Sequence, residues 1–279
     1  MNNATPFVKW VGGKKRLLNE LKIFFPEEYN KYYEPFLGGG SVFFNFSPKN
    51  ATIGDLNKQL INCYLTIRDN FDELKEKLLE LQNKNTSEEY YELRTEFNKL
   101  KQYDSNIIYV SAMFIYLNKA GYGGVYRENS KGGFNVPYGK YKSLNLYDEK
   151  KFIEIKKVLE NKNINILNSD YKDIIKDSKK GDFIYLDPPY YKENKSSFTK
   201  YQKQDFNEDN QKELFNLLNS LDKKGVYFLL SNSNTEFIKS LYKDYNITEV
   251  SVGRHINNKK KTIQKKNNEV LIYNYKKND

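Results

Sequence analysis

The sequence predicts an α/β protein with a largely parallel sheet and helices on both of its faces. Short apolar segments typical of strands alternate with segments of helical period, and this alternation builds parallel sheets. One predicted strand runs into three consecutive glycines, Gly38 to Gly40. The helical and glycine-rich stretch from 56 to 145 interrupts the alternation, so we interpret it as an insert in the α/β domain.

The individual elements follow from hydrophobic period and from helix breakers. The first half predicts a helix at 17–25 that ends at Pro26, a strand at 32–37, a helix opened by 42–46, a strand at 51–54, charged helices from 57 to about 101, and an apolar helix at 107–118. Segment 119–145 has no helical period. The second half predicts strands at 163–168, 181–187, 225–232 and 268–275, with helices such as 208–222 and 234–243 between some of them.

Composition excludes several classes of protein. The 279 residues are 38% hydrophobic and 15% aromatic, enough to bury a sizeable core. Cys63 and His255 are the only residues of their types, so one chain holds no disulfide framework and no Cys/His zinc site. With no signal peptide and no apolar run near 20 residues, we expect a cytoplasmic protein that is neither secreted nor inserted in a membrane.

The net charge of +10 suits a polyanionic partner, because Lys and Arg displace condensed counterions from phosphates. An AT-rich coding sequence, which enriches Lys and Asn on any solvated surface, gives the same composition. Arginine is therefore the more informative cation, and Arg127 is the only arginine in segment 119–145.

The glycines at 38–40 let backbone amides approach a ligand and lead into a helix. Such bends bind dinucleotides as well as S-adenosylmethionine, and a tight turn without a ligand has the same sequence. Asp55 ends the next strand, where a carboxylate can accept hydrogen bonds from ribose hydroxyls or cap a helix.

Asp187-Pro188-Pro189-Tyr190 is the more specific motif. It follows an apolar strand, so it belongs at the carboxyl edge of the sheet, where α/β folds bind ligands. Consecutive prolines stiffen the backbone and remove donors. The Asp187 carboxylate and the Pro188 carbonyl can then accept hydrogen bonds from one amino group, such as that of adenine, while Tyr190 stacks on an extruded base.

The segment 6–18 contains Gly12, Gly13 and Lys14 but lacks the full spacing of a phosphate loop, so we reject a nucleotide triphosphatase. Trp10, the only tryptophan, is either a core residue or a side chain that stacks on a ligand ring.

Taken in order, these segments resemble the Dam-type adenine-specific DNA methyltransferases: PFVKWVGGKK, EPFLGGGSVFFN, GDLN, YLNKAGYGGVYREN, GGFNVPYGKYK, YLDPPY and the final LIYNY. The resemblance covers nearly the whole chain, and residues 65–105 match least.

The resemblance implies a doubly wound, mostly parallel, Rossmann-like sheet with one antiparallel strand at 268–275. It implies a catalytic domain of 1–55 and 146–279 and a mainly helical DNA-recognition domain of 56–145. It also implies S-adenosylmethionine, no metal and the palindrome GATC. The matching positions for cofactor contacts are Trp10, Lys14, Phe36, Gly38, Gly40, Asp55, Asp170 and Asp187.

In the family the glycine-rich segment reads DNA. Local chemistry agrees: Arg127 is the only arginine of the segment, and a guanidinium can bind O6 and N7 of guanine bidentately. Lys9 matches a family position that contacts a guanine. Tyr122 can wedge into the base stack, and Val125 and Pro137 can touch a thymine methyl. The residues typical of phosphate-positioning groups are Asn129, Asn135, Lys140 and Lys142; a solvated loop surface is the alternative for these.

Two departures concern specificity: Lys140 stands where arginine is common in the family, and Val125 where leucine is common. Arg254, Lys259–Lys261 and Lys265–Lys266 form a basic loop that we expect to follow phosphates; a disordered charge run is the alternative.

The sequence thus predicts base flipping and direct in-line methyl transfer, without a cysteine nucleophile, by a monomer that a companion restriction endonuclease can accompany. The alternatives are the same chemistry on another sequence, on RNA or on the amino group of cytosine, a catalytically silent DNA-binding protein, and a nicotinamide-dependent Rossmann enzyme.

Overall fold

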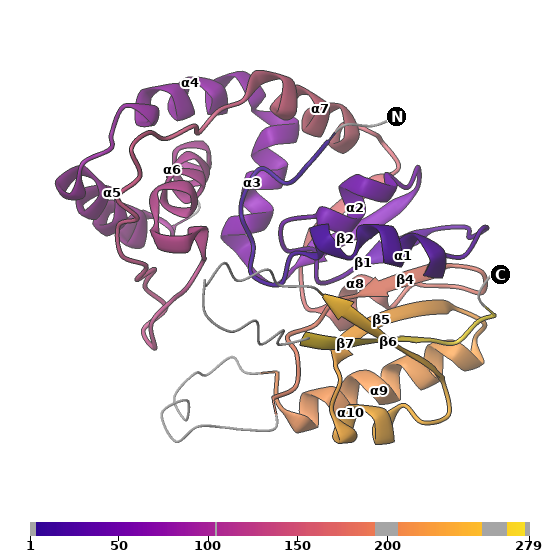
Figure 1. Cartoon of the computed structure of the whole chain (residues 1–279). Helices are drawn as coiled ribbons and strands as arrows, with labels where there is room; N and C mark the ends of the chain where they lie inside the picture. Colours follow the sequence, from indigo (N-terminus) through magenta and orange to yellow (C-terminus); the bar gives the residue numbers. More distant parts are fainter. Residues whose placement is uncertain (1–3, 104, 193–205, 253–266, 277–279) are drawn as a thin grey trace. The chain divides into compact units, whose positions relative to one another are not determined.

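The computed structural model describes residues 4–103, 105–192, 206–252 and 267–276. The chain divides into two compact units. The first unit comprises Met1–Lys14 and Leu37–Tyr171, and the second comprises Lys15–Phe36 and Lys172–Asp279. Each unit contributes strands and helices, and Figure 1 labels them in chain order.

The second unit carries five described strands, hydrogen-bonded in the order β1-β4-β5-β7-β6. These are β1 (Tyr32–Glu34), β4 (Phe183–Leu186), β5 (Tyr227–Ser233), β6 (Asn246–Val252) and β7 (Asn267–Tyr273). β4 is parallel to both β1 and β5, whereas β7 is antiparallel to both β5 and β6. The predicted antiparallel strand is therefore confirmed as β7.

Helices cover both faces of these strands. They are α1 (Leu18–Phe24), α8 (Tyr171–Ile175), α9 (Glu208–Lys223) and α10 (Glu236–Leu241), and Figure 1 shows α9 and α10 on one side and α1 on the other. Phe25, next to α1, packs its ring edge-on against Phe183 of β4 at 4.9 Å between centroids. A ring that leaves water completely contributes about 2 kcal/mol, so the buried Phe183 and the partly buried Phe25 help to hold α1 on the sheet.

The first unit carries the parallel pair β2 (Ala51–Asp55) and β3 (Ile164–Asn168), in register from Ala51 opposite Ile164 to Asp55 opposite Asn168. Between them in sequence come α3 (Lys58–Asp69), α4 (Phe71–Gln82), α5 (Ser87–Leu100), α6 (Ile107–Ala120), the 3-10 turn η2 (Tyr122–Gly124) and α7 (Glu149–Leu159). α2 (Ser41–Phe46) precedes β2, and the turn η1 (Lys14–Arg16) lies at the sequence boundary of the units.

α6 forms the centre of the helical part. Ten of its side chains are buried, and a helix that is apolar all round is an interior helix. It packs against α3, α4 and α5, which Figure 1 shows around it. α5 begins at a capping box in which Thr86 and Glu89 satisfy each other's backbone amides.

The predicted fold class is confirmed: the chain is an α/β protein with a mostly parallel sheet of seven described strands and flanking helices. Two predictions of detail were wrong. β1 ends at Glu34 and not at residue 37, because Pro35 has no N–H to donate to a strand partner. β6 was not predicted, since the sequence NITEVSV is too polar for its hydrophobic period to identify it as a strand. The proposed boundaries of a recognition domain at 56 and 145 stay a prediction.

Candidate functional site

The Asp187-Pro188-Pro189-Tyr190 loop begins directly after β4. All four residues of β4 are buried, and both neighbouring strands run parallel to it. The loop therefore leaves the carboxyl edge of a buried parallel strand, which is where α/β folds bind ligands. Asp187 is partly buried and Pro188 is buried, whereas Pro189 faces solvent.

The two proline carbonyls differ in what they bind. The Pro189 carbonyl accepts a hydrogen bond of 3.1 Å from Nε2 of Gln211 on α9. Within the described parts of the chain, no donor reaches the Pro188 carbonyl. Pro188 is a buried residue, so its carbonyl is an acceptor in a buried part of the loop without a described donor.

Buried amide side chains hold the loop from beneath. Gln211 and Asn232 of β5 are fully buried, and Asn232 Nδ2 donates to Gln211 Oε1 at 3.0 Å. Asn232 Oδ1 accepts from the N–H of Tyr191, and the Ser233 hydroxyl donates to the Tyr191 carbonyl at 2.8 Å. The network fixes the loop at both Pro189 and Tyr191.

Tyr190 is oriented by its hydroxyl, which donates to Oε2 of Glu269 on β7 at 2.8 Å. Burial raises the pKa of Tyr190, and the carboxylates of Asp187 and Glu269 raise this pKa further. The phenol is therefore neutral at any physiological pH, and its ring is held as a rigid aromatic face beside Asp187.

The glycine bend of the first unit lies against Trp10. Gly38 has a φ of +50°, and a Cβ on Gly38 would lie 2.6 Å from Cδ1 of Trp10. The indole in turn stacks on Tyr126 at 5.9 Å and 17° between planes. Only glycine permits this approach, so Trp10 forms one wall of the bend, as both the core and the ligand-stacking interpretations require.

Asp55 ties the bend to β2. Its Oδ2 accepts from the N–H of Gly38 and its Oδ1 from the N–H of Asn57, both at 2.9 Å. Burial raises the pKa of Asp55, and these backbone donors oppose that rise. The cap of α3 is Asn57, whose side chain accepts from Leu60. Asp55 is therefore not the helix cap; its carboxylate instead joins the glycine bend to the residues that follow β2.

Asp170 lies two residues beyond β3 and therefore near the same edge, since Asp55 and Asn168 are register partners. Asn168 Nδ2 donates to the Asp55 carbonyl at 3.0 Å.

Two further predicted cofactor contacts lie elsewhere in the chain. Lys14 is buried and donates to the Gly12 carbonyl. Phe36 belongs to the second unit, where its ring meets Phe206 edge to face at 5.9 Å.

Asn118 of α6 joins the N-terminal segment to segment 119–145. It is 1% exposed, and its Oδ1 accepts from the N–H of Lys9 while Nδ2 donates to the carbonyls of Lys9 and Gly124. Gly124 also lies against the Lys9 side chain, and a Cβ on Gly124 would clash with Cδ of Lys9. Asn118 therefore joins two short segments that carry three of the residues predicted to contact DNA. These residues are Lys9, Tyr122 and Val125.

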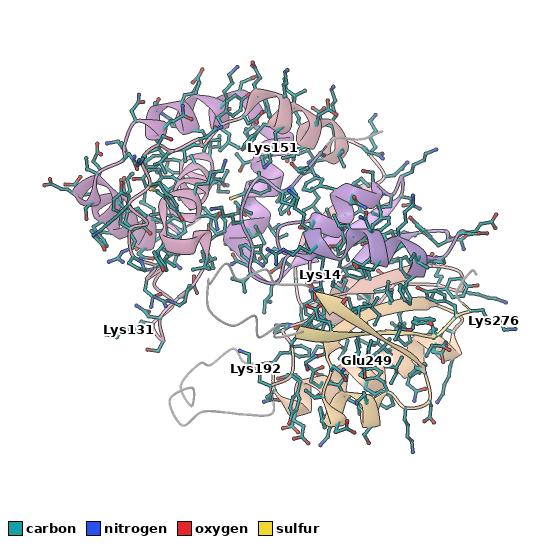
Figure 2. All side chains as sticks on the ribbon, in the orientation of Figure 1. Lys14, Lys131, Lys151, Lys192, Glu249 and Lys276 are labelled. Carbon is teal, nitrogen blue, oxygen red and sulfur yellow. The ribbon has the colours of Figure 1, made fainter. Side chains whose placement is uncertain are left out.

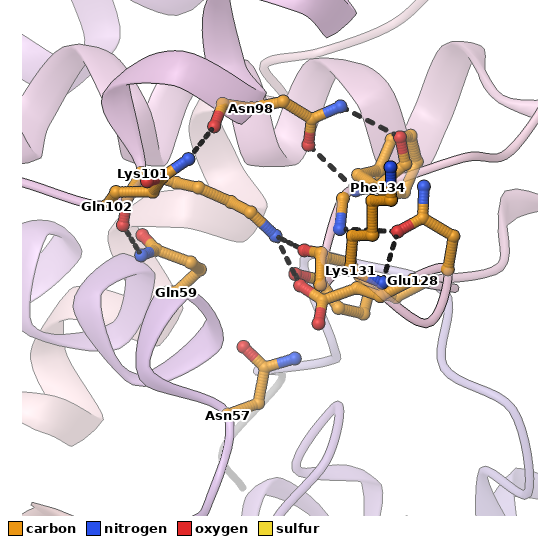
Figure 3. Close-up of polar contacts among 12 residues, drawn as sticks. Asn57, Gln59, Asn98, Lys101, Gln102, Glu128, Lys131 and Phe134 are labelled. Carbon is orange, nitrogen blue, oxygen red and sulfur yellow. Dashed lines mark hydrogen bonds and ion pairs between the residues drawn. The ribbon is translucent and has the colours of Figure 1, made fainter. Parts of the chain in front are cut away.

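Residues 121–138, which we call the glycine-rich hairpin, are closed by two antiparallel bridges, Gly121 with Tyr138 and Glu128 with Phe134. The end of α5 anchors the hairpin (Figure 3). Asn98 donates to the Phe134 carbonyl and accepts from its N–H. Lys101 forms an ion pair with Glu128 and donates to the Gly132 carbonyl.

Most predicted DNA contacts in this part of the chain are exposed. Tyr122 is 68% exposed, and Figure 2 shows Lys131 at the hairpin tip, pointing away from the helices. Asn129 closes the tip by accepting from the N–H groups of Lys131 and Gly133 at 3.0 Å each. The remaining exposed groups of the prediction are Arg127, Pro137, Lys140 and Lys142, whereas Val125 and Asn135 are partly buried.

Sequence reasoning missed the amides Asn98, Asn118, Gln211 and Asn232. Asn118 and Asn232 carried a usable signal, since each is a carboxamide in an apolar run, and a buried amide must find partners. Asn98 and Gln211 lie in polar helices and had no such signal. The predicted basic loop, with Arg254, Lys259–Lys261 and Lys265–Lys266, lies outside the described residues, as does His255.

Cys63 is fully buried on α3, and burial raises the pKa of its thiol well above the usual range. A buried thiol is inert as a nucleophile. Among the described residues no group of His, Cys, Asp and Glu side chains is arranged to hold a metal ion. No helix in the described ranges has the length and apolarity to cross a membrane.

A glycine bend, an acidic residue at the end of β2 and another shortly after β3, and an Asp-Pro-Pro-Tyr loop after β4 are features expected of an α/β methyltransferase. The family model of the D12 class N6 adenine-specific DNA methyltransferases matches residues 10–256, and the chain belongs to this family. It is an adenine-specific DNA methyltransferase.

Several curated relatives match along nearly their whole length. The type II methyltransferase M1.LlaDCHI of Lactococcus lactis subsp. cremoris is 38% identical over 98% of this chain and 96% of its own. The type II methyltransferase M.MjaIII of Methanocaldococcus jannaschii is 40% identical over 97% and 99%. The DNA adenine methylase of Escherichia coli K12 is 30% identical over 98% and 96%.

Proposed function

We propose that this enzyme transfers the methyl group of S-adenosylmethionine to the 6-amino nitrogen of an adenine in duplex GATC, after that adenine has turned out of the helix. One observation carries the proposal. The Asp187 carboxylate and the Pro188 carbonyl follow each other at the end of β4, and the Pro188 carbonyl has no donor in the described chain while the Pro189 carbonyl is taken by Gln211.

Two adjacent acceptors suit the two hydrogens of an exocyclic amino group. The lone pair of that nitrogen is delocalised into the purine ring, and holding both hydrogens favours a pyramidal, more nucleophilic nitrogen. Tyr190, fixed by Glu269, presents a flat face on which a flipped base stacks. These groups position the nitrogen before reaction, which is the main contribution available when the methyl carbon is already activated.

The residues of the glycine bend fit the methyl donor. Gly38 leaves no room for a side chain beside Trp10, Asp55 retains lone pairs for ribose hydroxyls, and Asp170 lies close to the same edge. When bound, S-adenosylmethionine supplies a sulfonium-activated methyl carbon. Asp187 and the Pro188 carbonyl would hold the amino nitrogen for attack on that carbon; the sulfur would leave as the thioether S-adenosylhomocysteine, and the displaced amino proton would pass to solvent. No enzyme-bound covalent intermediate is needed, in keeping with the buried Cys63.

The glycine-rich hairpin and Lys9 are the proposed reading surface, within a recognition domain of residues 56–145. Arg127 and Lys9 supply donors for guanine, Tyr122 an exposed aromatic wedge, and Val125 and Pro137 apolar contacts for thymine. Asn129, Lys140 and Lys142, and the basic loop 254–266, would lie along phosphates. The names of the type II relatives support a companion restriction endonuclease, and a monomer suffices for one methyl transfer.

The test is transfer of labelled methyl from S-adenosylmethionine to four substrates: duplex DNA with one GATC, the same duplex with a substituted site, the single strand, and the corresponding RNA. We expect N6-methyladenine in the first duplex only, together with altered cutting by nucleases that distinguish modified GATC. Equal transfer to the substituted duplex would exclude GATC specificity, and transfer to the RNA without transfer to either duplex would exclude DNA as the substrate. DNA binding without any transfer would identify a catalytically silent protein.

A further inference from the structure

The side chain of Arg127 is held by Asn135 across the glycine-rich hairpin. Arg127 Nε donates to Asn135 Oδ1 at 2.8 Å, and Arg127 Nη2 donates to the Asn135 carbonyl at 3.3 Å. The N–H of Asn135 donates back to the Arg127 carbonyl at 3.1 Å. The two residues are thus joined by both main-chain and side-chain hydrogen bonds.

We propose that Asn135 is a positioning residue for base recognition: it occupies one edge of the Arg127 guanidinium and thereby fixes the edge that meets guanine. The proposal rests on the function proposed above and changes the role expected of Asn135 from the sequence, which is to position a phosphate.

A guanidinium carries five N–H donors in a planar fork, and two of its edges can bind a bidentate acceptor. The edge made by Nε and Nη2 is occupied by Asn135. The edge made by Nη1 and Nη2 remains, and Arg127 is exposed. Its two parallel donors match O6 and N7 of guanine, which lie side by side in the major groove.

The pair is held from beneath by α5. Asn98 fixes Phe134, the residue before Asn135, and Lys101 fixes Glu128, the residue after Arg127. Both strands of the hairpin are therefore anchored one residue away from the pair. A free arginine side chain loses much rotamer entropy when it binds. Arg127, held in this way, is oriented before DNA arrives, and this orientation favours guanine over the other bases.

The experiment measures kcat/KM on a set of duplexes in which each base pair of the recognised site is replaced in turn. In Asn135→Ala, we expect the preference for guanine at the Arg127 position to fall by about tenfold or more, since a bidentate base contact gives roughly that discrimination. Preferences at the other positions should stay the same. In Asn135→Asp the carboxylate still accepts from Nε, so the preference should stay near wild type although binding to every duplex weakens.

Two comparisons keep the result interpretable. Lys131→Ala at the hairpin tip should weaken binding to all duplexes equally and reduce the dependence of that binding on salt concentration. In an Arg127→Ala background, Asn135→Ala should cause no further loss of preference. The positioning role would be overturned if Asn135→Ala lowered kcat/KM equally on every duplex. It would also be overturned if Asn135→Asp lost the preference for guanine at the Arg127 position. If wild type methylates no duplex, the proposed function itself fails, and the wild-type assay detects that separately.

Discussion

The Asp-Pro-Pro-Tyr loop and the glycine-rich hairpin are held in the same way but used differently. Buried carboxamides anchor each: Gln211 and Asn232 hold the loop, and Asn118 holds the start of the hairpin. The loop follows a buried strand, and we propose that it keeps the Pro188 carbonyl for the amino group of its ligand. The hairpin instead projects Tyr122 and Arg127 into solvent.

This difference follows from the proposed ligands. An amino group must be desolvated and held by fixed acceptors, because electrostatic interactions are strongest where water is excluded. A DNA duplex stays outside the protein and is read by side chains that reach into its grooves. Substitutions in the loop should therefore reduce turnover, whereas those in the hairpin should reduce DNA recognition.

The largest effect is expected for Asp187→Ala. Removing the carboxylate leaves one acceptor for the amino group, so single-turnover methyl transfer should fall on the order of a thousandfold. The variant should still fold and bind duplex DNA, as measured by thermal melting and by gel shift. Near-normal turnover in Asp187→Ala would show that the loop does not hold the reacting nitrogen.

Gln211→Leu should produce the next largest effect. It leaves the Pro189 carbonyl and the Asn232 amide without their partner, which costs about 1–3 kcal/mol of unfolding free energy per group. A displaced loop should also lower kcat by about 100-fold. Thermal melting and single-turnover kinetics measure the two effects. Lys212→Ala, at the exposed neighbouring residue, is the control, and a stable Gln211→Leu with normal kcat would contradict the positioning role.

Asn118→Ala should affect DNA binding more than turnover. It removes three hydrogen bonds that join Lys9 and Gly124 to α6, so KM for duplex DNA should rise by about tenfold while kcat changes less. Asn118→Asp retains the acceptor for the Lys9 N–H and should be intermediate. Equal losses in kcat and in S-adenosylmethionine binding would point to general unfolding of the first unit.

The smallest effect concerns pH. Lys119 donates to the carbonyls of Asn145 and Leu146, and burial lowers the pKa of Lys119 to about 8. The unfolded chain keeps this proton up to about pH 10.4, so between pH 8 and 10 the unfolded state binds more protons and Lys119 adds to stability as pH rises. Its contribution is at most about 1.4 kcal/mol per pH unit.

Urea melts from pH 7 to 10 would measure this contribution against Lys119→Met, in which it should be absent. Lys150→Met, at an exposed lysine, should retain the wild-type dependence. Identical pH profiles for wild type and Lys119→Met would show that the Lys119 ammonium is not desolvated.

Local sequence patterns predicted most of the elements and indicated a candidate position for the chemistry. The apolar run at 107–118 predicted α6, and the glycines at 38–40 together with Asp187-Pro188-Pro189-Tyr190 predicted two ligand-binding edges. These patterns are readable because a buried strand, a positive φ and a rigid proline pair each restrict the residue types allowed. β6 lacked such a pattern, and β1 was shortened by Pro35.

Only the tertiary structure decided the pairings of polar groups. Asn57 rather than Asp55 caps α3. Gln211 donates to the carbonyl of Pro189 and not to that of Pro188. Asn135 accepts from the guanidinium of Arg127. Each pairing except the first joins residues from separate elements or strands, and all three depend on which donor lies within about 3 Å of an acceptor. Sequence shows which groups can form hydrogen bonds, but the packing of helices and strands fixes which partners meet.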